Sequence, residues 1–248
     1  MSPDEALTRE QVLRELVFLA TVEHALIVEY LSVQCALGHD LPAGAGGPAT
    51  PALRDAAKDA GRLAVRQMRH LMAVNDTLAA VGLDAQVGRA DSIDGIALGP
   101  PSLAQLQQLA EREKVIALAV DERYERLRQA VKAPNPALEE QLLGTVQFLL
   151  DGVQEHVDEV TSLLTALDGL APTDFLRATR RETTDQFEQR LLDVTDKAYG
   201  LLVRIVEAWF AQKGSGPFQT WAFDAMFALD DNHRLLVQRG LLPAFTLP

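Results

Sequence analysis

The sequence predicts an all-α protein built around a bundle of four long helices. Six segments repeat apolar residues every three or four positions, which is the period of an amphipathic helix, and no segment alternates with the period of two typical of a half-buried strand. Glycine and proline are concentrated between these segments. Four consecutive helices of about 30 residues are each roughly 45 Å long, which is the size of a helical bundle rather than of a globin.

The ends of the predicted helices carry recognisable capping signals. Thr8 and Gln11 form a capping box at the start of the first helix. Thr50 precedes Pro51, so a cap is followed by a proline at the first helical position of the second helix. The predicted helices cover about 8–37, 50–82, 102–133, 136–168, 183–213 and 217–240.

The chain is predicted to form a single domain over residues 1–248. No internal repeat and no convincing domain boundary interrupts it. The core bundle is expected over residues 8–168, and the last two helices over 183–240 are expected to pack on it as an extension. The spacers 38–51 and 88–101 are rich in glycine and proline and are predicted to be loops.

Composition excludes several classes of function. The 23 basic and 35 acidic residues give a net charge of −12, which argues against a nucleic-acid partner. The single cysteine, Cys35, cannot form an internal disulfide, so nothing indicates an oxidising compartment. The N-terminus lacks the pattern of a signal peptide, and Glu23, Glu29 and Glu207 break the longest apolar runs, so no membrane span is expected. We therefore expect a soluble, cytoplasmic protein whose partner is a small-molecule substrate, with no membrane or nucleic-acid partner.

Polar residues interrupt the apolar stripes that are predicted to face the bundle interior. Glu23 lies in the first helix, His70 in the second and His156 in the fourth, while the phase of the third leaves open whether Asp121 or Glu122 faces inward. Burying an unpaired carboxylate costs on the order of several kcal/mol, so such a group must be neutralised, paired or bound to a metal. Carboxylates and imidazoles are also the ligands that helical bundles use for iron or manganese.

Two stretches, Leu19–Tyr30 (LATVEHALIVEY) and Gln67–Gly82 (QMRHLMAVNDTLAAVG), resemble the ferritin-like superfamily. Within it, the chain is similar to the branch that contains the violacein-pathway iminophenylpyruvate dimer synthases. Glu23, His24 and Tyr30 match the first-helix pattern of a ligand Glu followed by His, with a Tyr a heptad further on. The matching positions of the second helix are Met68, His70, Leu71, Asn75, Leu78 and Gly82.

The resemblance covers the four-helix core, about residues 8–168. It implies a ferritin-like antiparallel four-helix bundle with two additional C-terminal helices. It further implies a metal-binding, iron-dependent oxidoreductase of small-molecule biosynthesis.

The ligand set of a di-iron ferritin-like site is incomplete in this sequence. In such a site the second and fourth helices each supply Glu-x-x-His, whereas here the motifs are Gln67-x-x-His70 and Val153-x-x-His156. The two remaining carboxylates supply a charge of −2, enough for one divalent cation, and a second buried cation would be uncompensated. The site is therefore expected to hold one iron or manganese ion, or no metal at all. The predicted metal ligands are Glu23, His70, Asp121 and His156.

Other polar residues near this site are candidates for binding substrate. Tyr30 is either a catalytic residue or an apolar part of the core. Gln67 either forms a hydrogen bond with substrate or water, or is a buried amide whose hydrogen bonds are satisfied within the protein. A basic row along the second helix is either a solvated face or a source of substrate contacts, in which Arg66 or Arg69 orients a substrate carboxylate. The row is Arg54, Lys58, Arg62, Arg66 and Arg69.

The predicted site is open to three interpretations. The favoured one is a ferritin-like enzyme of small-molecule, secondary metabolism that oxidises an organic substrate with one bound metal ion. The second is a metal-free isomerase, cyclase or dehydratase that moves protons in the same cavity, and the third is a non-catalytic binding bundle. The candidate catalytic residues are Glu23, His70, His156, Tyr30 and Gln67. A homodimer is also possible through Trp209, Phe210, Trp221, Phe223 and Phe227 of the last two helices.

Overall fold

Six long helices form most of the part of the chain that is described. The computed structural model describes residues 8–38, 50–100, 108–130, 136–168, 176–179, 181–212 and 216–246. The helices are α1 (Arg9–Ala36), α2 (Pro51–Ala80), α4 (Leu109–Ala130), α5 (Pro136–Leu167), α7 (Gln186–Ala211) and α8 (Phe218–Gln238). The predicted all-α class is confirmed. The start predicted for the third helix, at residue 102, lies outside the described residues.

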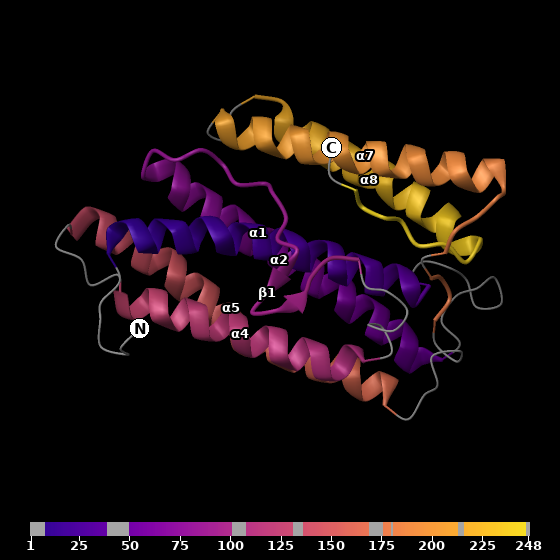
Figure 1. Ribbon diagram of the computed structural model, residues 1–248, viewed down its shortest axis with the longest axis horizontal. Coiled ribbons are helices and arrows are strands. Elements are labelled where there is room, and N and C mark those ends of the chain that lie inside the picture. Colours follow the sequence, from indigo (N-terminus) through magenta and orange to yellow (C-terminus); the bar gives the residue numbers. More distant parts are fainter. Residues whose placement is uncertain are drawn as a thin grey trace.

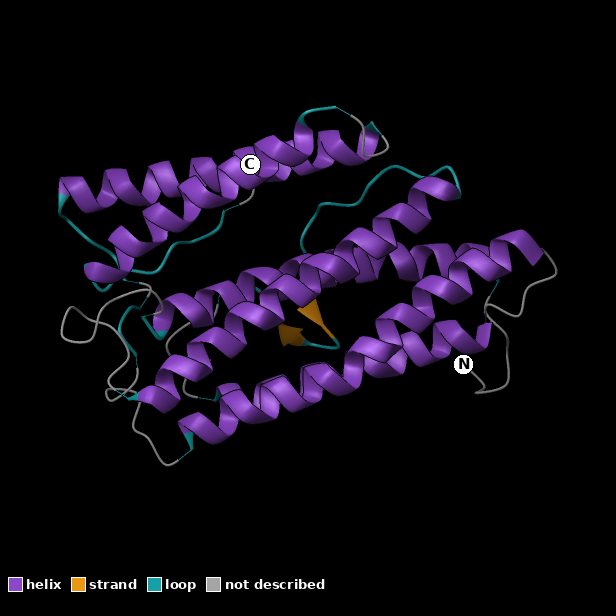
Figure 2. Ribbon diagram, turned by 180° about the vertical axis from the view of Figure 1, so that it is seen from behind, coloured by secondary structure: helices purple, strands orange, loops and turns teal. Residues whose placement is uncertain are grey.

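The four core helices form one group, and the last two form a hairpin beside it. Figure 1 shows α7 and α8 running together along the α1–α2 side of the bundle, with α4 and α5 on the opposite side. Figure 2 shows the same order of helices from behind. Both predicted N-caps are confirmed, since Thr8 and Gln11 form the capping box of α1 and the Thr50 side chain accepts from the backbone of Leu53 in α2.

Helix α1 is the central helix of the fold. Every residue from Val22 to Tyr30 is buried. By length and composition α1 is apolar enough to cross a membrane, contrary to the expectation from Glu23 and Glu29, because one 18-residue window has a mean hydropathy of 1.7. Of that window, 78% is buried inside the protein. This apolarity is that of a core helix covered by its neighbours.

Two arginines of α4 bind carboxylates of α1. Nη2 of Arg112 donates to Oε2 of Glu29 at 3.1 Å, and Nη1 of Arg123 donates to Oε1 of Glu15 at 2.6 Å. Glu29 is fully buried. A buried carboxylate without a partner would be strongly destabilising, so Arg112 is what allows Glu29 to lie inside the bundle. Glu29 therefore anchors α4 rather than merely interrupting an apolar run.

A short hairpin lies in the spacer that was predicted to be a loop. Strands β1 (Ser92–Ile93) and β2 (Ile96–Ala97) pair in antiparallel fashion. Asp94 and Gly95 between them have φ angles of 48° and 83°, the left-handed pair typical of a type I′ turn. The prediction of a loop was wrong for these two strands. Strands of two residues are too short to show alternation, and only the Asp-Gly pair marks the turn in the sequence. Arg123 also donates to Oδ1 of Asp94 at 2.5 Å, which ties the hairpin to α4.

A buried hydrogen-bonded chain attaches α7 to α1. Nδ1 of His24 lies 2.9 Å from the carbonyl oxygen of Val87 and 3.2 Å from that of Gly88, and it carries the proton because carbonyl oxygens only accept. Nε2 of His24 therefore accepts from the hydroxyl of Tyr199 at 2.6 Å. Burial lowers the pKa of His24 and raises the pKa of Tyr199 to about 12, so both groups are neutral at pH 7.

The C-terminal helices expose several large aromatic side chains. Phe227 is 71% exposed, and Trp221 and Phe223 are about half exposed. Phe210, which was also predicted for a dimer interface, is buried within the chain at 8% exposure, because it lies on the inward face of α7. The homodimer itself stays a prediction.

Helix α8 buries a histidine against the C-terminal segment. The ring of His233 lies 5.0 Å from the ring of Phe245, and both residues are buried. Burial lowers the pKa of His233 to about 4. The folded protein therefore holds this imidazole in its neutral form at pH 7.

Replacement of Tyr199 with Phe is expected to lower the free energy of unfolding by about 1–3 kcal/mol, because Nε2 of the buried His24 loses its donor. Urea unfolding at pH 7 measures the loss. The control is Thr195→Val in the same helix, whose hydroxyl donates only to the carbonyl of Leu191 one turn earlier and should cost less. Equal losses in the two variants would contradict a special role for the His24–Tyr199 bond.

Acidification is expected to weaken the fold through His233. The unfolded chain has a histidine pKa of about 6.5, so between pH 6.5 and 4 the unfolded state binds a proton that the folded state does not. This contribution to the unfolding free energy is complete above about pH 6.5 and falls by about 3 kcal/mol as the pH drops to 4. Urea unfolding across this range should show a shallower pH dependence in His233→Leu than in the wild type. Identical pH profiles would refute this assignment.

Candidate functional site

Glu23 of α1 and His70 of α2 meet in the interior of the bundle. Oε2 of Glu23 lies 3.5 Å from Nδ1 of His70. Glu23 is fully buried and His70 is 5% exposed. The helical period brings them inward with the rest of their stripes, which in α1 include the buried residues Leu16, Ala20, Ile27 and Tyr30. The carboxylate and the imidazole therefore lie close enough to interact in the buried interior of the bundle.

Gln67 lies one turn before His70 on the same face of α2. Its side chain is buried, with 1% exposed. Oε1 of Gln67 has no hydrogen-bond partner among the described residues. A buried acceptor left unsatisfied costs about 1–3 kcal/mol, so this oxygen is available to a bound molecule or water. In the di-iron pattern the same position holds a Glu, so the amide removes one negative charge from the site.

One aromatic side chain contacts the Glu23–His70 pair, and a second lies further along α1. Tyr30 lies two turns after Glu23 on α1 and is fully buried. The ring of Phe148 from α5 meets the ring of His70 edge-on, with 5.9 Å between centroids. Phe148 is 46% exposed, so its ring contacts His70 on one side and solvent on the other. Sequence reasoning missed Phe148, because it lies off the apolar stripe that predicted the inward face of the fourth helix.

The side chains of the other two predicted ligands, Asp121 and His156, lie outside the described residues, although the backbones of α4 and α5 are described at both positions. Glu122 is exposed on α4, so it does not face the interior. Within the described part of the chain, no three His, Cys, Asp or Glu side chains gather into a group that could hold a metal ion. The roles of Asp121 and His156 stay predictions.

Comparison with known proteins identifies the fold. No protein family model matches the chain, and no curated protein matches it. Among solved structures, it is similar to a crystal structure at 1.95 Å resolution of a ferritin-like protein from Caulobacter vibrioides, with a TM-score of 0.65. The match covers 98% of this chain and 99% of the other, at 12% sequence identity. The fold is ferritin-like. The violacein-pathway branch of the resemblance stays a prediction, because a likeness at this identity carries the fold alone.

The arginines predicted to bind substrate border a different part of the ferritin-like bundle. Arg66 and Arg69 line a cleft between α2 and α8 that neither Gln67 nor His70 lines. Nη2 of Arg66 donates to Oε1 of Glu159 on α5 at 3.2 Å. A role for either arginine toward a substrate held at the Glu23–His70 pair stays a prediction.

The buried site has too few described donor groups to hold a metal ion on its own. Ferritin-like bundles hold iron with carboxylates and histidines that project inward from several helices. The described donors are one carboxylate from Glu23, one imidazole from His70 and the amide of Gln67. Catalytic metal sites use at least three strong protein ligands, so these residues alone do not make one. They form a buried carboxylate–imidazole contact with an unsatisfied amide oxygen one turn away on α2.

A double-mutant cycle measures the coupling of the pair. Glu23→Gln and His70→Gln are expected to destabilise together by about 1 kcal/mol less than the sum of their separate effects, because each residue stabilises the other. Urea unfolding at pH 7 with a chelator present gives the four free energies. The control pairs Glu23→Gln with Ser32→Ala, nine residues and about 13 Å further along α1, where additivity is expected. Additive effects of the first pair would rule out the coupling.

Proposed function

We propose that this chain is a ferritin-like enzyme of small-molecule metabolism that transfers protons on an organic substrate with Glu23 and His70. The observation that supports this proposal is the distance of 3.5 Å between the two side chains in a buried location. A carboxylate and an imidazole in an apolar core stabilise a fold less well than apolar residues of the same volume, and such pairs are concentrated at active sites. We expect the enzyme to act in the cytoplasm, as the sequence predicts.

Each residue has a defined role in this proposal. The carboxylate of Glu23 removes a proton from a carbon next to a carbonyl or imine, and the electron pair of the broken C–H bond moves toward the oxygen or nitrogen. His70 delivers a proton to a second atom of the substrate, so the reaction has no net change in oxidation state. Oε1 of Gln67 accepts a hydrogen bond from a substrate N–H or O–H, and Tyr30 and His156 are candidates for positioning. This chemistry is that of an isomerase, cyclase or dehydratase.

A metal-dependent oxidative enzyme is the second candidate. The observation in its favour is that Glu23 and His70 are two of the four ligands predicted for a single iron or manganese ion, and they lie together. Asp121 of α4 and His156 of α5 would complete the set. When bound, the ion would polarise the substrate or activate oxygen. The proton-transfer proposal needs only the contact between Glu23 and His70.

Deuterium exchange tests the proton-transfer proposal. The purified protein is incubated in D2O with 2-oxo acids and imines derived from aromatic amino acids, the substrate class implied by the sequence resemblance, and exchange at the carbon next to the carbonyl is followed by NMR. Glu23→Gln should slow exchange by about 10²-fold or more, because a general base contributes about 10²–10⁴-fold. Glu15→Gln, the same change in the same helix at a residue paired with Arg123, is the control and should retain the rate.

The outcomes separate the two candidates. Exchange that persists after exhaustive chelation and depends on Glu23 supports metal-free proton transfer. Exchange that disappears with the chelator and returns with Fe(II) supports the metal-dependent enzyme instead. A wild-type protein that exchanges none of these substrates, or an unchanged rate in Glu23→Gln, would overturn the proposal.

A further inference from the structure

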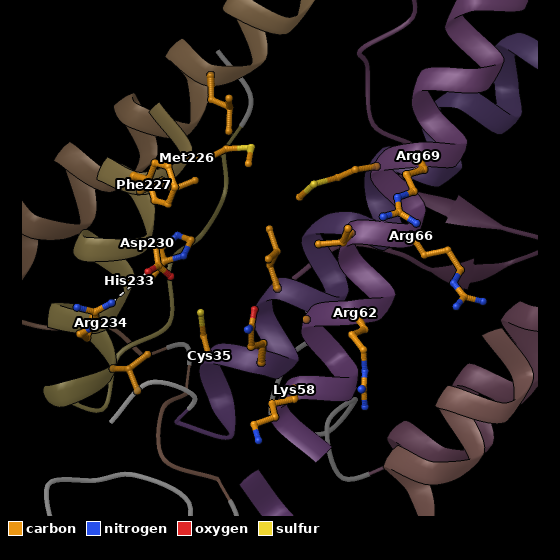
Figure 3. Close-up of a pocket in the computed structure, with 18 of the residues that line it drawn as sticks. Cys35, Lys58, Arg62, Arg66, Arg69, Met226, Phe227, Asp230, His233 and Arg234 are labelled. Atoms are coloured by element: carbon orange, nitrogen blue, oxygen red, sulfur yellow. Dashed lines mark hydrogen bonds and ion pairs between the residues drawn. The ribbon is translucent and has the colours of Figure 1, made fainter. Parts of the chain in front are cut away.

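A second potential site lies outside the bundle core, between α8 and the α1–α2 pair. The cleft has a volume of about 800 Å³. Figure 3 shows side chains of α8 on one wall and those of α1 and α2 on the other. Much of its lining is apolar and includes Leu31, Val65, Met68, Met226, Phe227 and Val237. Neither Glu23 nor His70 lines it, so a molecule bound here would not touch the buried pair.

His233 supplies an unsatisfied polar group to this cleft. The residue lines the cleft from α8 and is only 7% exposed. Its Nε2 has no hydrogen-bond partner among the described residues. The imidazole is neutral at pH 7, so it offers a ligand an uncharged hydrogen bond. A buried nitrogen without a partner, in a residue that lines a cleft, is a group that a bound molecule can satisfy.

The cleft is basic although the protein is strongly acidic. Five cationic side chains and two carboxylates line it, in a chain of net charge −12. Four of the cations have carboxylate partners, in the pairs Lys58–Asp55, Arg62–Asp59, Arg66–Glu159 and Arg234–Asp230. Arg69, the fifth, has no ion pair or hydrogen bond among the described residues. A guanidinium in this state is suited to bind a carboxylate, sulfonate or phosphate through two N–H donors.

We propose that the cleft between α8 and the α1–α2 pair binds an elongated organic anion with an apolar body. Arg69 binds the acidic group, and the apolar part of the ligand covers Val65, Met68 and Phe227. His233 forms a hydrogen bond with a polar atom further along the ligand, since Figure 3 shows Arg69 and His233 on opposite walls. Phe227, which is 71% exposed, becomes covered by the ligand.

Matched fluorescent probes test the anion and the apolar body separately. 8-Anilinonaphthalene-1-sulfonate carries a sulfonate, and N-phenyl-1-naphthylamine has the same aromatic body without charge. Arg69→Gln should weaken binding of the sulfonate by about tenfold, because a hydrogen bond to a charged group is lost, and leave the neutral probe unchanged. Arg54→Gln is the matched control, since Arg54 is exposed on the same helix and does not line the cleft.

Cys35 reports where the probes bind. It is the one cysteine of the chain, and it lines the cleft from α1. Bound sulfonate probe should slow the alkylation of Cys35 by iodoacetamide in the native protein, and decanoate should displace the probe. Failure to slow alkylation, or equal sulfonate affinities in Arg69→Gln and Arg54→Gln, would overturn the proposal.

A second competition experiment tests the role of His233. 10-Hydroxydecanoate should displace the sulfonate probe about fivefold better than decanoate, because its hydroxyl gains a neutral hydrogen bond. The advantage should disappear in His233→Leu, whose folding is verified by circular dichroism and by retained binding of the neutral probe. An advantage that persists in this variant would show that His233 does not contact the ligand. None of these measurements depends on activity at Glu23 and His70, so the outcome is independent of the proposed enzyme.

Discussion

The structure depends on the need to satisfy two carboxylates buried in the apolar helix α1. Glu23 and Glu29 are both fully buried, and a charge in a core of low dielectric must have a partner. Arg112 of α4 binds Glu29, while His70 of α2 lies against Glu23. The first partner is a guanidinium and the second is an imidazole. The two buried carboxylates of α1 are therefore partnered by different helices, Glu29 by α4 and Glu23 by α2.

Helix α2 separates two regions of different chemistry. Its inward face carries Gln67 and His70, and His70 lies next to the buried carboxylate of Glu23 of α1. Four members of its basic row, Lys58, Arg62, Arg66 and Arg69, border the cleft beneath α8. Because one turn of helix contains only 3.6 residues, neighbours in the sequence such as Met68 and Arg69 belong to a different environment from His70. The C-terminal hairpin that creates the cleft is attached to α1 through His24 and Tyr199.

The helices and the buried pair could be predicted from the sequence, and several contacts could not. The inward stripes of α1 and α2 predicted that Glu23 and His70 would be buried, because helical periodicity depends only on spacing along the chain. The pairing of Arg112 with Glu29 and the contact of Phe148 with His70 join helices that are far apart in sequence, and no local pattern encodes such distances. The hairpin around Asp94 and Gly95 was also missed, because two-residue strands have no period.

The sequence by itself determined the all-α class and placed Glu23 and His70 on the inward stripes of their helices, because both are properties of residue type and spacing within single helices. The resemblance to ferritin-like proteins predicted the bundle, and the fold is ferritin-like. Only the tertiary structure decided which helix face each polar residue occupies relative to other helices. It left Gln67 with an unsatisfied buried oxygen in the core and opened a basic cleft next to His233, because packing angles and the position of α8 follow from interactions between distant segments.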